Sequence, residues 1–174
     1  MTPGGHHDRP DLAGEHPRGD AAQLVLLAAF FATWVTDSFL FHYSTYLARW
    51  VPPVPRTLVG VASVACFALL ERSGLKAVFG DIRNPPRVVT KGPFTHCRHP
   101  IYLGEVLLYF GLAFAGGSLA SLALAVTGAF LFRALANHEE RLLLNKFGEE
   151  YARYAASTPK WLPVPWRRHR RRNE

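Results

Sequence analysis

Long apolar segments separated by short polar ones fill most of the chain between residues 21 and 137. The first segment runs from Ala21 to Ala48, and its only acid and only histidine are Asp37 and His42. As a helix this segment would be roughly 42 Å long, which crosses a hydrocarbon core of about 30 Å with some tilt. Trp50 and a group of prolines end it. Asp37 and His42 lie about 140° apart around such a helix, so we expect separate packing or pore-lining positions for them.

The second apolar segment begins near Arg56. Its uncharged part, Thr57 to Leu70, is 14 residues long, which is too short to cross a bilayer. Continuing the helix to Phe79 gives the required length and leaves its charged side chains near one interface. The segment from Asp81 to Arg98 contains Pro-Pro and Gly-Pro pairs and is predicted to be a loop.

A third apolar run extends over 27 residues, from Val106 to Phe132, without one charge. The sequence Gly-Gly-Ser at 116–118 falls in its middle and is a strong turn signal. The run therefore predicts two transmembrane helices, His99 to Ala115 and Ser118 to Asn137. They form a hairpin whose outer ends return to the same membrane face.

Beyond Asn137, apolar positions recur at helical spacing as far as Tyr154, and Thr158-Pro159 ends the pattern. This predicts an amphipathic helix that continues the fourth span, with Trp161 and Trp166 as interfacial anchors. The predicted fold class is therefore all-α: an integral membrane protein with about four transmembrane helices, the last two forming a hairpin, and a C-terminal cytoplasmic amphipathic helix.

Total composition alone does not indicate a membrane protein, because the 49% apolar content is close to the soluble average. The distribution of charge is more informative. Lys and Arg gather in residues 71–99 and after Arg133, whereas the 49–56 turn holds two and the 116–118 turn none. The positive-inside rule then places both termini and the 71–99 block in the cytoplasm. The net charge of +7 comes largely from the C-terminal arginines, which in this context predict binding to anionic lipid and not to nucleic acid.

The chain ends and the cysteines add little chemistry. Residues 1–20 are polar and rich in Gly and Pro, so we expect them to be disordered. The apolar run that follows is too long for a signal peptide. The two cysteines, Cys66 and Cys97, do not form a disulfide framework and fit a reducing, cytoplasm-facing site.

A polar, cationic segment, Gly92 to Tyr102, lies at the edge of the third apolar run. Pro100 can open a helix, which places Arg98 and His99 beside free backbone N–H groups at the helix N-terminus. Such an end binds a carboxylate or a phosphate, and the arginine adds charge and donors. An interfacial anchor with Tyr102 at headgroup level explains these residues equally well.

Several acids are further candidates. A pair of acids such as Glu139 and Glu140 usually forms a solvated face. The predicted hairpin, however, brings this pair back to the surface that carries the cationic segment. One of them could bind ribose hydroxyls or an ammonium group, and the other could pair with an arginine. Glu105 lies one turn inside the third span, and we expect it to pair with Arg133 at matching depth. No convincing metal-ligand spacing is present, since His96 and His99 indicate a metal only weakly.

Two separated motifs carry a family resemblance, and they match in spacing and order over roughly residues 86 to 163. They read Gly92-Pro93-Phe94-x-x-x-Arg98-His99-Pro100-x-Tyr102-x-Gly104 and Glu139-Glu140-x-x-Leu143-x-x-x-Phe147-Gly148-x-x-Tyr151-x-x-Tyr154. With these motifs the chain resembles the isoprenylcysteine carboxyl methyltransferase and phospholipid methyltransferase superfamily.

The resemblance implies a multi-pass methyltransferase of the bacterial cell membrane that uses S-adenosylmethionine at a cytoplasmic site, with a lipophilic acceptor entering from the bilayer. The cofactor-binding residues that it implies are Val88, Val89, Phe94, His99, Pro100, Tyr102, Gly104 and Glu139. The predicted catalytic residues are Arg98, Glu140 and Arg133. The predicted regions are a disordered tail (1–20), two N-terminal transmembrane helices (21–79), the cofactor-binding core with the hairpin (80–163) and a basic tail (164–174).

Two departures from the family pattern bear on the acceptor. Phe94 stands where many members have tyrosine, and Leu135 stands where the prenyl-protein enzymes place an arginine for the substrate carboxylate. Arg133 is roughly 200° away around the helix and cannot replace that arginine. A phospholipid amine, an isoprenoid, a thiol or another small lipophile remains open as the acceptor, and so does the oligomeric state.

Two other functions compete with the methyltransferase. A non-enzymatic membrane scaffold or transport accessory with the same fold explains the spans and the basic tail, but not the paired motifs. A soluble nucleic-acid binder is opposed by the long apolar runs.

Overall fold

The computed structural model describes residues 19–80 and 85–161 of the 174-residue chain. Over these ranges the fold is all-helical and contains no strand, which confirms the all-α part of the predicted fold class. Five α-helices are present: α1 (Gly19–Val35), α2 (Pro53–Phe79), α3 (Pro100–Gly116), α4 (Leu119–Phe147) and α5 (Glu149–Ser157). Three short segments have other helical geometries: η2 (Thr36–Phe41) is a π-helix, and η3 (Tyr46–Arg49) and η4 (Gly92–Thr95) are 3-10 helices. The predicted basic tail, Trp166 and most of the predicted N-terminal tail lie outside the described residues.

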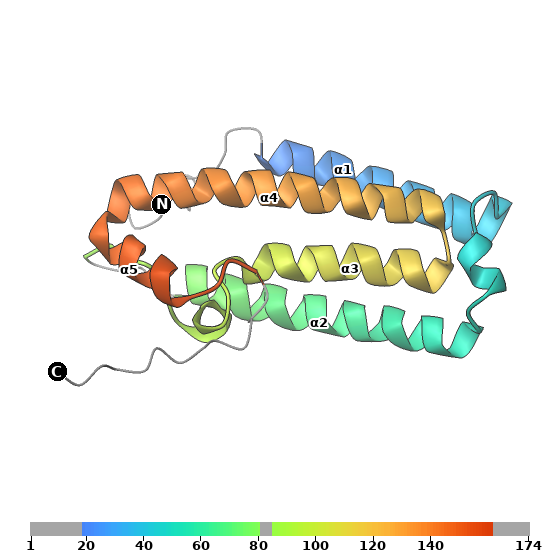
Figure 1. The fold of residues 1–174 in the computed structure, drawn as a ribbon, viewed down its shortest axis with the longest axis horizontal. Coiled ribbons are helices and arrows are strands. Elements are labelled where there is room, and N and C mark those ends of the chain that lie inside the picture. The colour runs from blue at the N-terminus through green and yellow to red at the C-terminus, as the bar shows by residue number, and fades with distance from the viewer. Residues whose placement is uncertain (1–18, 81–84, 162–174) are drawn as a thin grey trace, which may run out of the picture.

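The four long helices run side by side and alternate in direction (Figure 1). The helix α2 packs extensively on α3, α3 packs on α4, and α4 also packs on α1. The short helix α5 lies across the end of the bundle where α2 ends and α3 begins (Figure 1). The connection between α3 and α4 lies at the opposite end.

Within the described part of the chain, three helical segments are long and apolar enough to cross a membrane: Gly19–Phe41, Pro53–Phe79 and Leu119–Phe147. The remaining predicted span, α3, is apolar but has only 17 residues. Large apolar side chains remain on the outside of the bundle, where Val25, Leu69 and Phe130 are 69%, 70% and 69% exposed. An apolar surface of this extent suits lipid and not water.

The first helix is shorter than predicted. It ends at Phe41 instead of Ala48, and His42 turns the chain with a φ of 55°. The reason is Asp37, which is fully buried and accepts hydrogen bonds from the backbone N–H of Ser44, at 2.8 Å, and from the Ser44 hydroxyl. By turning back, the chain supplies donors to an acid that would otherwise lie unpaired in an apolar environment.

The predicted α3–α4 hairpin is confirmed. Gly117 ends α3 with a φ of 68°, a left-handed conformation that glycine adopts without strain. Ser118 then caps α4 by accepting a hydrogen bond from the N–H of Ser121 at 3.0 Å. The Ser118 hydroxyl also reaches Asp37, so the end of the first helical segment is tied to the hairpin turn.

The fourth helix continues beyond Asn137, as predicted, but the helix does not run unbroken to Tyr154. The helix α4 extends well past Asn137, to Phe147, and stops at Gly148, which has a φ of 51°. After this glycine the chain turns and α5 folds back, which buries Tyr151. The break at Gly148 therefore directs α5 toward the start of α3.

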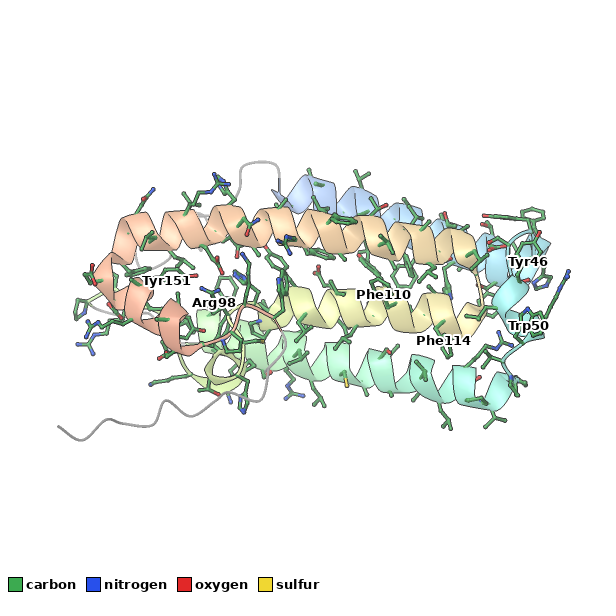
Figure 2. The ribbon with its side chains drawn as sticks, in the orientation of Figure 1. Tyr46, Trp50, Arg98, Phe110, Phe114 and Tyr151 are labelled. Carbon is green, nitrogen blue, oxygen red and sulfur yellow. The ribbon has the colours of Figure 1, made fainter. Side chains whose placement is uncertain are left out.

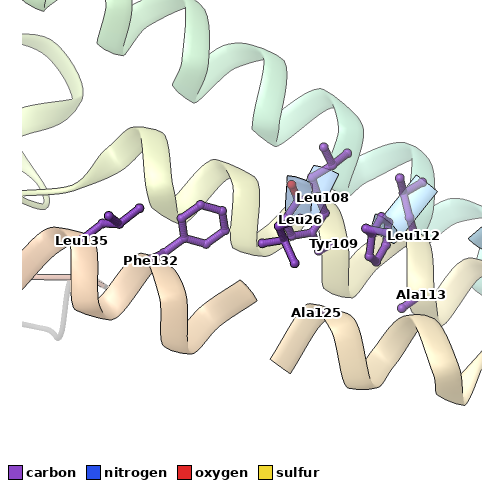
Figure 3. Close-up of a cluster of buried hydrophobic side chains, with 9 residues drawn as sticks. Leu26, Leu108, Tyr109, Leu112, Ala113, Ala125, Phe132 and Leu135 are labelled. Atoms are coloured by element: carbon purple, nitrogen blue, oxygen red, sulfur yellow. The ribbon is translucent and has the colours of Figure 1, made fainter. Parts of the chain in front are cut away.

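The apolar core lies between α1, α3 and α4 (Figure 3). The rings of Phe30 and Tyr109 lie 4.5 Å apart between centroids, and Phe132 is fully buried beside them. The indole N–H of Trp34 donates to the carbonyl of Leu112 at 2.7 Å, which links α1 directly to α3. Close packing and such hydrogen bonds hold helices together in lipid, where burial of apolar surface contributes little.

Candidate functional site

The residues of the two sequence motifs meet at one end of the bundle. Arg98 and Tyr151 lie there, beneath the last turns of α4, whereas Tyr46 and Trp50 mark the other end (Figure 2). The start of α3, the end of α4 and the residues after α5 all reach this end (Figure 1). The two motifs therefore form one site, as the hairpin predicted.

The loop before α3 fixes the first motif. The N–H of Cys97 donates to the carbonyl of Pro93 at 3.3 Å, and the N–H of Arg98 donates to the carbonyl of Pro159 at 2.9 Å. His99 directly precedes α3, and Pro100 is the first residue of the helix, where its missing N–H costs nothing. Burial raises the pKa of the Cys97 thiol, so this cysteine stays uncharged at neutral pH.

His99 lies between the two glutamates. Its side chain is 4% exposed, its Nε2 is 3.1 Å from Glu140 Oε1, and its Nδ1 is 3.6 Å from Glu139 Oε2. Burial alone lowers the pKa of His99, but the hydrogen bonds and charges of the two carboxylates outweigh it and raise the pKa above its ordinary value. The imidazolium, with a proton on each nitrogen, is therefore the form that this environment favours.

Glu140 is contacted by two further cations. Its Oε1 is 3.4 Å from Arg98 Nη2, and its Oε2 accepts a hydrogen bond from Lys160 Nζ at 3.0 Å. Three positive groups thus surround one carboxylate. With Glu139 included, three cations face two carboxylates when His99 is protonated, and one positive charge is left over.

Aromatic groups pack around this charged cluster. The hydroxyl of Tyr102 donates to Glu139 Oε1. The ring of His99 stacks on that of Tyr102, with 5.9 Å between centroids, and the ring of Trp161 lies 5.7 Å from His99 on a tilted plane. Trp161, which was predicted to be an interfacial anchor, thus packs on the ring of His99.

The helix α5 is tied to the loop that carries the rest of the first motif. The N–H of buried Val88 donates to Glu150 Oε1 at 3.0 Å, and the Tyr154 hydroxyl donates to the carbonyl of Phe94 at 2.7 Å. Burial raises the pKa of Tyr151 to about 12, so its hydroxyl stays protonated near Arg98. These contacts make α5 and the loop one wall of the site.

Other predicted residues lie elsewhere. Arg133 is exposed, and the described residues contain no ion pair between it and Glu105, so the predicted pairing of these two is wrong. Gly104 faces α2, where a Cβ would come within 3.3 Å of Leu70 Cβ. Pro100 is buried at the start of α3, and Val89 is half-buried in the loop.

The sequence analysis missed Lys160, Trp161 and Glu150 as members of the site. The available signal was Thr158-Pro159, which ends α5 and allows the residues after it to return to the bundle. That return is held by the backbone hydrogen bond from Arg98 to Pro159. No periodicity predicts such a contact.

The cluster has unused binding capacity. Arg98 Nε is buried without a hydrogen-bond partner, and it lies beside the N-terminus of α3, whose first backbone N–H groups have no partner within the helix. An excess positive charge with free donors suits a carboxylate. Within residues 19–80 and 85–161, no group of three or more His, Cys, Asp or Glu side chains is arranged to hold a metal ion.

Comparison with known proteins identifies a family model and several relatives. Residues 55–150 match the family model described as phospholipid methyltransferase. The chain is 36% identical over 132 residues to the cobalt-zinc-cadmium resistance protein CzcN of Cupriavidus metallidurans, covering 75% of this chain and 59% of that protein. It is 37% identical over 90 residues to methanethiol S-methyltransferase 1 of Bradyrhizobium diazoefficiens, covering 51% of this chain and 30% of that protein.

A third relative is the nickel-cobalt-cadmium resistance protein NccN of Alcaligenes xylosoxydans xylosoxydans, which is 34% identical over 88 residues. That match covers 50% of this chain and 41% of the relative. The chain thus spans less than two thirds of the length of each of these three relatives.

Proposed function

The chain belongs to the phospholipid methyltransferase family, whose model matches more than half of it, and from this premise we propose that it is a membrane methyltransferase that uses S-adenosylmethionine and acts on a lipophilic acceptor. The observation that carries the proposal is the meeting of the two motifs in one cluster, where His99 lies between Glu139 and Glu140. The helices make this a membrane protein. We further propose a bacterial cell membrane, with the cluster and both chain ends on the cytoplasmic side, from the placement of Lys and Arg.

The residues of the cluster fit the cofactor. The free Arg98 Nε and the N-terminus of α3 suit the carboxylate of its methionine part, and Glu139 suits its ribose hydroxyls. When bound, the cofactor supplies an electrophilic methyl group on a sulfonium. Val88, Val89 and Phe94 belong to the loop that α5 holds in place, so we propose them as the wall against which the cofactor rests.

The side chains of the site act mainly by positioning the reactants and excluding water, and less by acid–base chemistry. The rings of Trp161 and Tyr102 both pack against His99, which is almost inaccessible to water. Contacts from Arg98 and Lys160 hold Glu140 rigidly, so the polar groups are oriented before any ligand binds. Holding two reactants in line in such a site supplies a large part of the rate of a group transfer.

A scaffold without enzymatic activity is less well supported. Gathering three cations and two carboxylates at a partly buried helix end has a desolvation cost that their mutual contacts must offset. A purely structural bundle has no need of such a cluster. The names of two relatives mention metal resistance and that of a third mentions methyl transfer to methanethiol, and these names leave the acceptor of this chain open.

Binding of S-adenosylhomocysteine to the purified protein in detergent, measured by calorimetry, tests the proposal. We expect saturable binding that weakens about tenfold or more in Arg98→Gln, because a charged hydrogen bond contributes roughly 1.5–3 kcal/mol. The matched control is Arg141→Gln, since Arg141 follows Glu140 on α4, is exposed and, among the described residues, hydrogen-bonds only within its own helix. Absence of binding by the folded protein, or equal affinities for both variants, would overturn the proposal.

A further inference from the structure

A group of exposed aromatic side chains lies at the end of the bundle opposite the charged cluster. It belongs to residues 39–50, the aromatic segment, which includes the end of η2 and all of η3. The large side chains that this segment exposes are Phe39, Leu40, Phe41, Tyr43, Tyr46 and Trp50. Trp50 is 85% exposed, and Tyr46 and Trp50 mark this end of the molecule in Figure 2. Such a surface is rare on a protein that stands in water.

The inner side of the aromatic segment is fastened to the start of α4. The backbone N–H of Leu119 donates to the carbonyl of Ser44 at 3.1 Å, and the N–H of Ala120 donates to the Ser44 hydroxyl at 2.9 Å. The same hydroxyl donates to Asp37, which is fully buried. Turning the segment so that its aromatic side chains face the core would break these hydrogen bonds, so the rings stay on the outside.

The chemistry of the aromatic segment matches the boundary between lipid and water. Tyrosine and tryptophan combine an apolar ring with a polar tip, and they gather at the interfaces of membrane proteins. The segment continues directly from the first membrane-crossing helical segment, which ends at Phe41. Arg49 is exposed, and its guanidinium carbon lies 5.3 Å from the centroid of the Tyr46 ring. A guanidinium at this level suits the phosphate of a phospholipid.

The lengths of the helices fit a headgroup position for the aromatic segment. From Leu119, beside the segment, to Glu139 in the charged cluster, α4 rises roughly 30 Å, which is close to the thickness of a hydrocarbon core. The 17 residues of α3 rise about 25 Å between the hairpin turn and the cluster. When the aromatic segment lies in the headgroup layer of one leaflet, the charged cluster therefore lies at the interface of the other leaflet.

We propose that the aromatic segment is an interfacial anchor. It binds the phospholipid headgroup layer on the membrane face opposite the charged cluster, and it sets the depth of the bundle in the bilayer. A shift of the bundle along the membrane normal would carry charged groups of the cluster into hydrocarbon, where they are costly, or would lift the spans out of it. The anchor opposes that shift, whatever reaction takes place at the cluster.

Depth measurements by electron paramagnetic resonance test the anchor. The full-length chain in a Cys66→Ser, Cys97→Ser background carries one nitroxide, at Tyr46→Cys or at Trp50→Cys, in vesicles of phosphatidylcholine and phosphatidylglycerol. Access of the nitroxide to oxygen, which concentrates in hydrocarbon, is compared with its access to a water-soluble nickel chelate. We expect both nitroxides in the headgroup layer, which extends about 5–7 Å beyond the hydrocarbon boundary. Both labelled positions are exposed, so these substitutions leave the core unaltered.

Phe130→Cys and Glu149→Cys provide matched references at exposed positions, on the membrane-crossing part of α4 and on α5 beyond it. The nitroxide at Phe130 should have the highest oxygen access and the lowest nickel access, and the nitroxide at Glu149 the reverse. Nickel access at Tyr46 and Trp50 equal to that at Glu149 places the aromatic segment in water and refutes the anchor. Low access to both reagents shows that a second copy or another protein covers the segment, and it refutes the assignment to lipid.

The depth-setting role has its own test, the combined variant Tyr43→Ser, Tyr46→Ser, Trp50→Ser. We expect the depth of a nitroxide at Phe130 to change in this variant by more than repeated measurements differ, because the bundle has lost its anchor. The control combines Val54→Ser, Leu58→Ser and Val61→Ser, which remove exposed apolar side chains from α2. An unchanged depth in the aromatic variant, or an equal change in the control, shows that the aromatic segment does not set the depth.

Discussion

At the scale of single residues, the charged cluster depends on contacts that no spacing rule encodes. The sequence analysis predicted the residue types, a cation pair before one helix and an acid pair after another, and it predicted that they share one surface. It did not predict that His99 lies between both acids, or that Lys160 joins Glu140. Such contacts arise from side-chain packing at a helix end, which periodicity does not describe.

The environment of His99 predicts a pH-dependent stability. Its pKa is raised in the folded protein, so its contribution is fully present below the unfolded value of about 6.5 and is lost as pH rises through the folded value. We therefore expect the melting temperature of the unaltered protein in detergent to fall as the pH increases through this range. The fall should be smaller in His99→Gln.

His96→Gln provides the comparison, because His96 is exposed only three residues away. Its melting profile should follow that of the unaltered protein. If the melting temperature of His99→Gln depends on pH as strongly as that of the unaltered protein, His99 and its two carboxylates are not the source of the pH dependence.

At the scale of elements, the hairpin was predicted correctly because Gly-Gly-Ser interrupts an uncharged run, and both the break and the cap are local signals. The end of the first helix was predicted seven residues too late, at Ala48 instead of Phe41. Asp37 accepts hydrogen bonds from Ser44, just beyond the end of that helix, and from Ser118 in the hairpin turn. Local sequence could not identify these partners.

The capped turn predicts a stability loss in Ser118→Ala. Ser118 is 1% exposed, caps α4 and donates to Asp37. Losing the cap and a hydrogen bond to a charged group should cost about 2 kcal/mol. Reversible unfolding in mixed micelles measures this.

Ser73→Ala is the control for this measurement, since Ser73 is exposed on α2 and, as far as the described residues go, hydrogen-bonds only to its own helix. Its effect should stay within about 0.5 kcal/mol. Equal losses in the two variants are incompatible with a stabilising link between Asp37 and the hairpin turn.

At the scale of the whole molecule, the alternating directions of the four long helices place the charged cluster and the η2–η3 segment at opposite ends of the bundle (Figure 1). The apolar pattern was sufficient to predict this topology, because each span is bounded by prolines, glycines or charges. It did not predict the break at Gly148, which turns α5 back onto the site. The family motifs include this glycine, but the direction of the turn depends on its backbone conformation.

The topology predicts labelling from opposite sides of the membrane. In a Cys66→Ser, Cys97→Ser background, Tyr46→Cys should react with an impermeant maleimide in intact bacterial cells, and Lys91→Cys only after lysis. Both positions are exposed, and α2, roughly 40 Å long, separates their ends of the bundle.

Trp50→Cys and Thr90→Cys repeat the comparison at neighbouring exposed positions. Labelling of all four in intact cells excludes a spanning bundle. The reversed pattern excludes the proposed cytoplasmic site while leaving the spans intact.

The hydrogen bonds of Asp37 also set an order for biosynthesis. Ser44 is seven residues from Asp37 along the chain, whereas Ser118 is 81 residues away. When the ribosome has delivered the first span, the acid therefore has one of its serine partners and lacks the other. Ser118 follows α3, so we expect the hydrogen bonds of Asp37 to be complete only once the turn between α3 and α4 has been made.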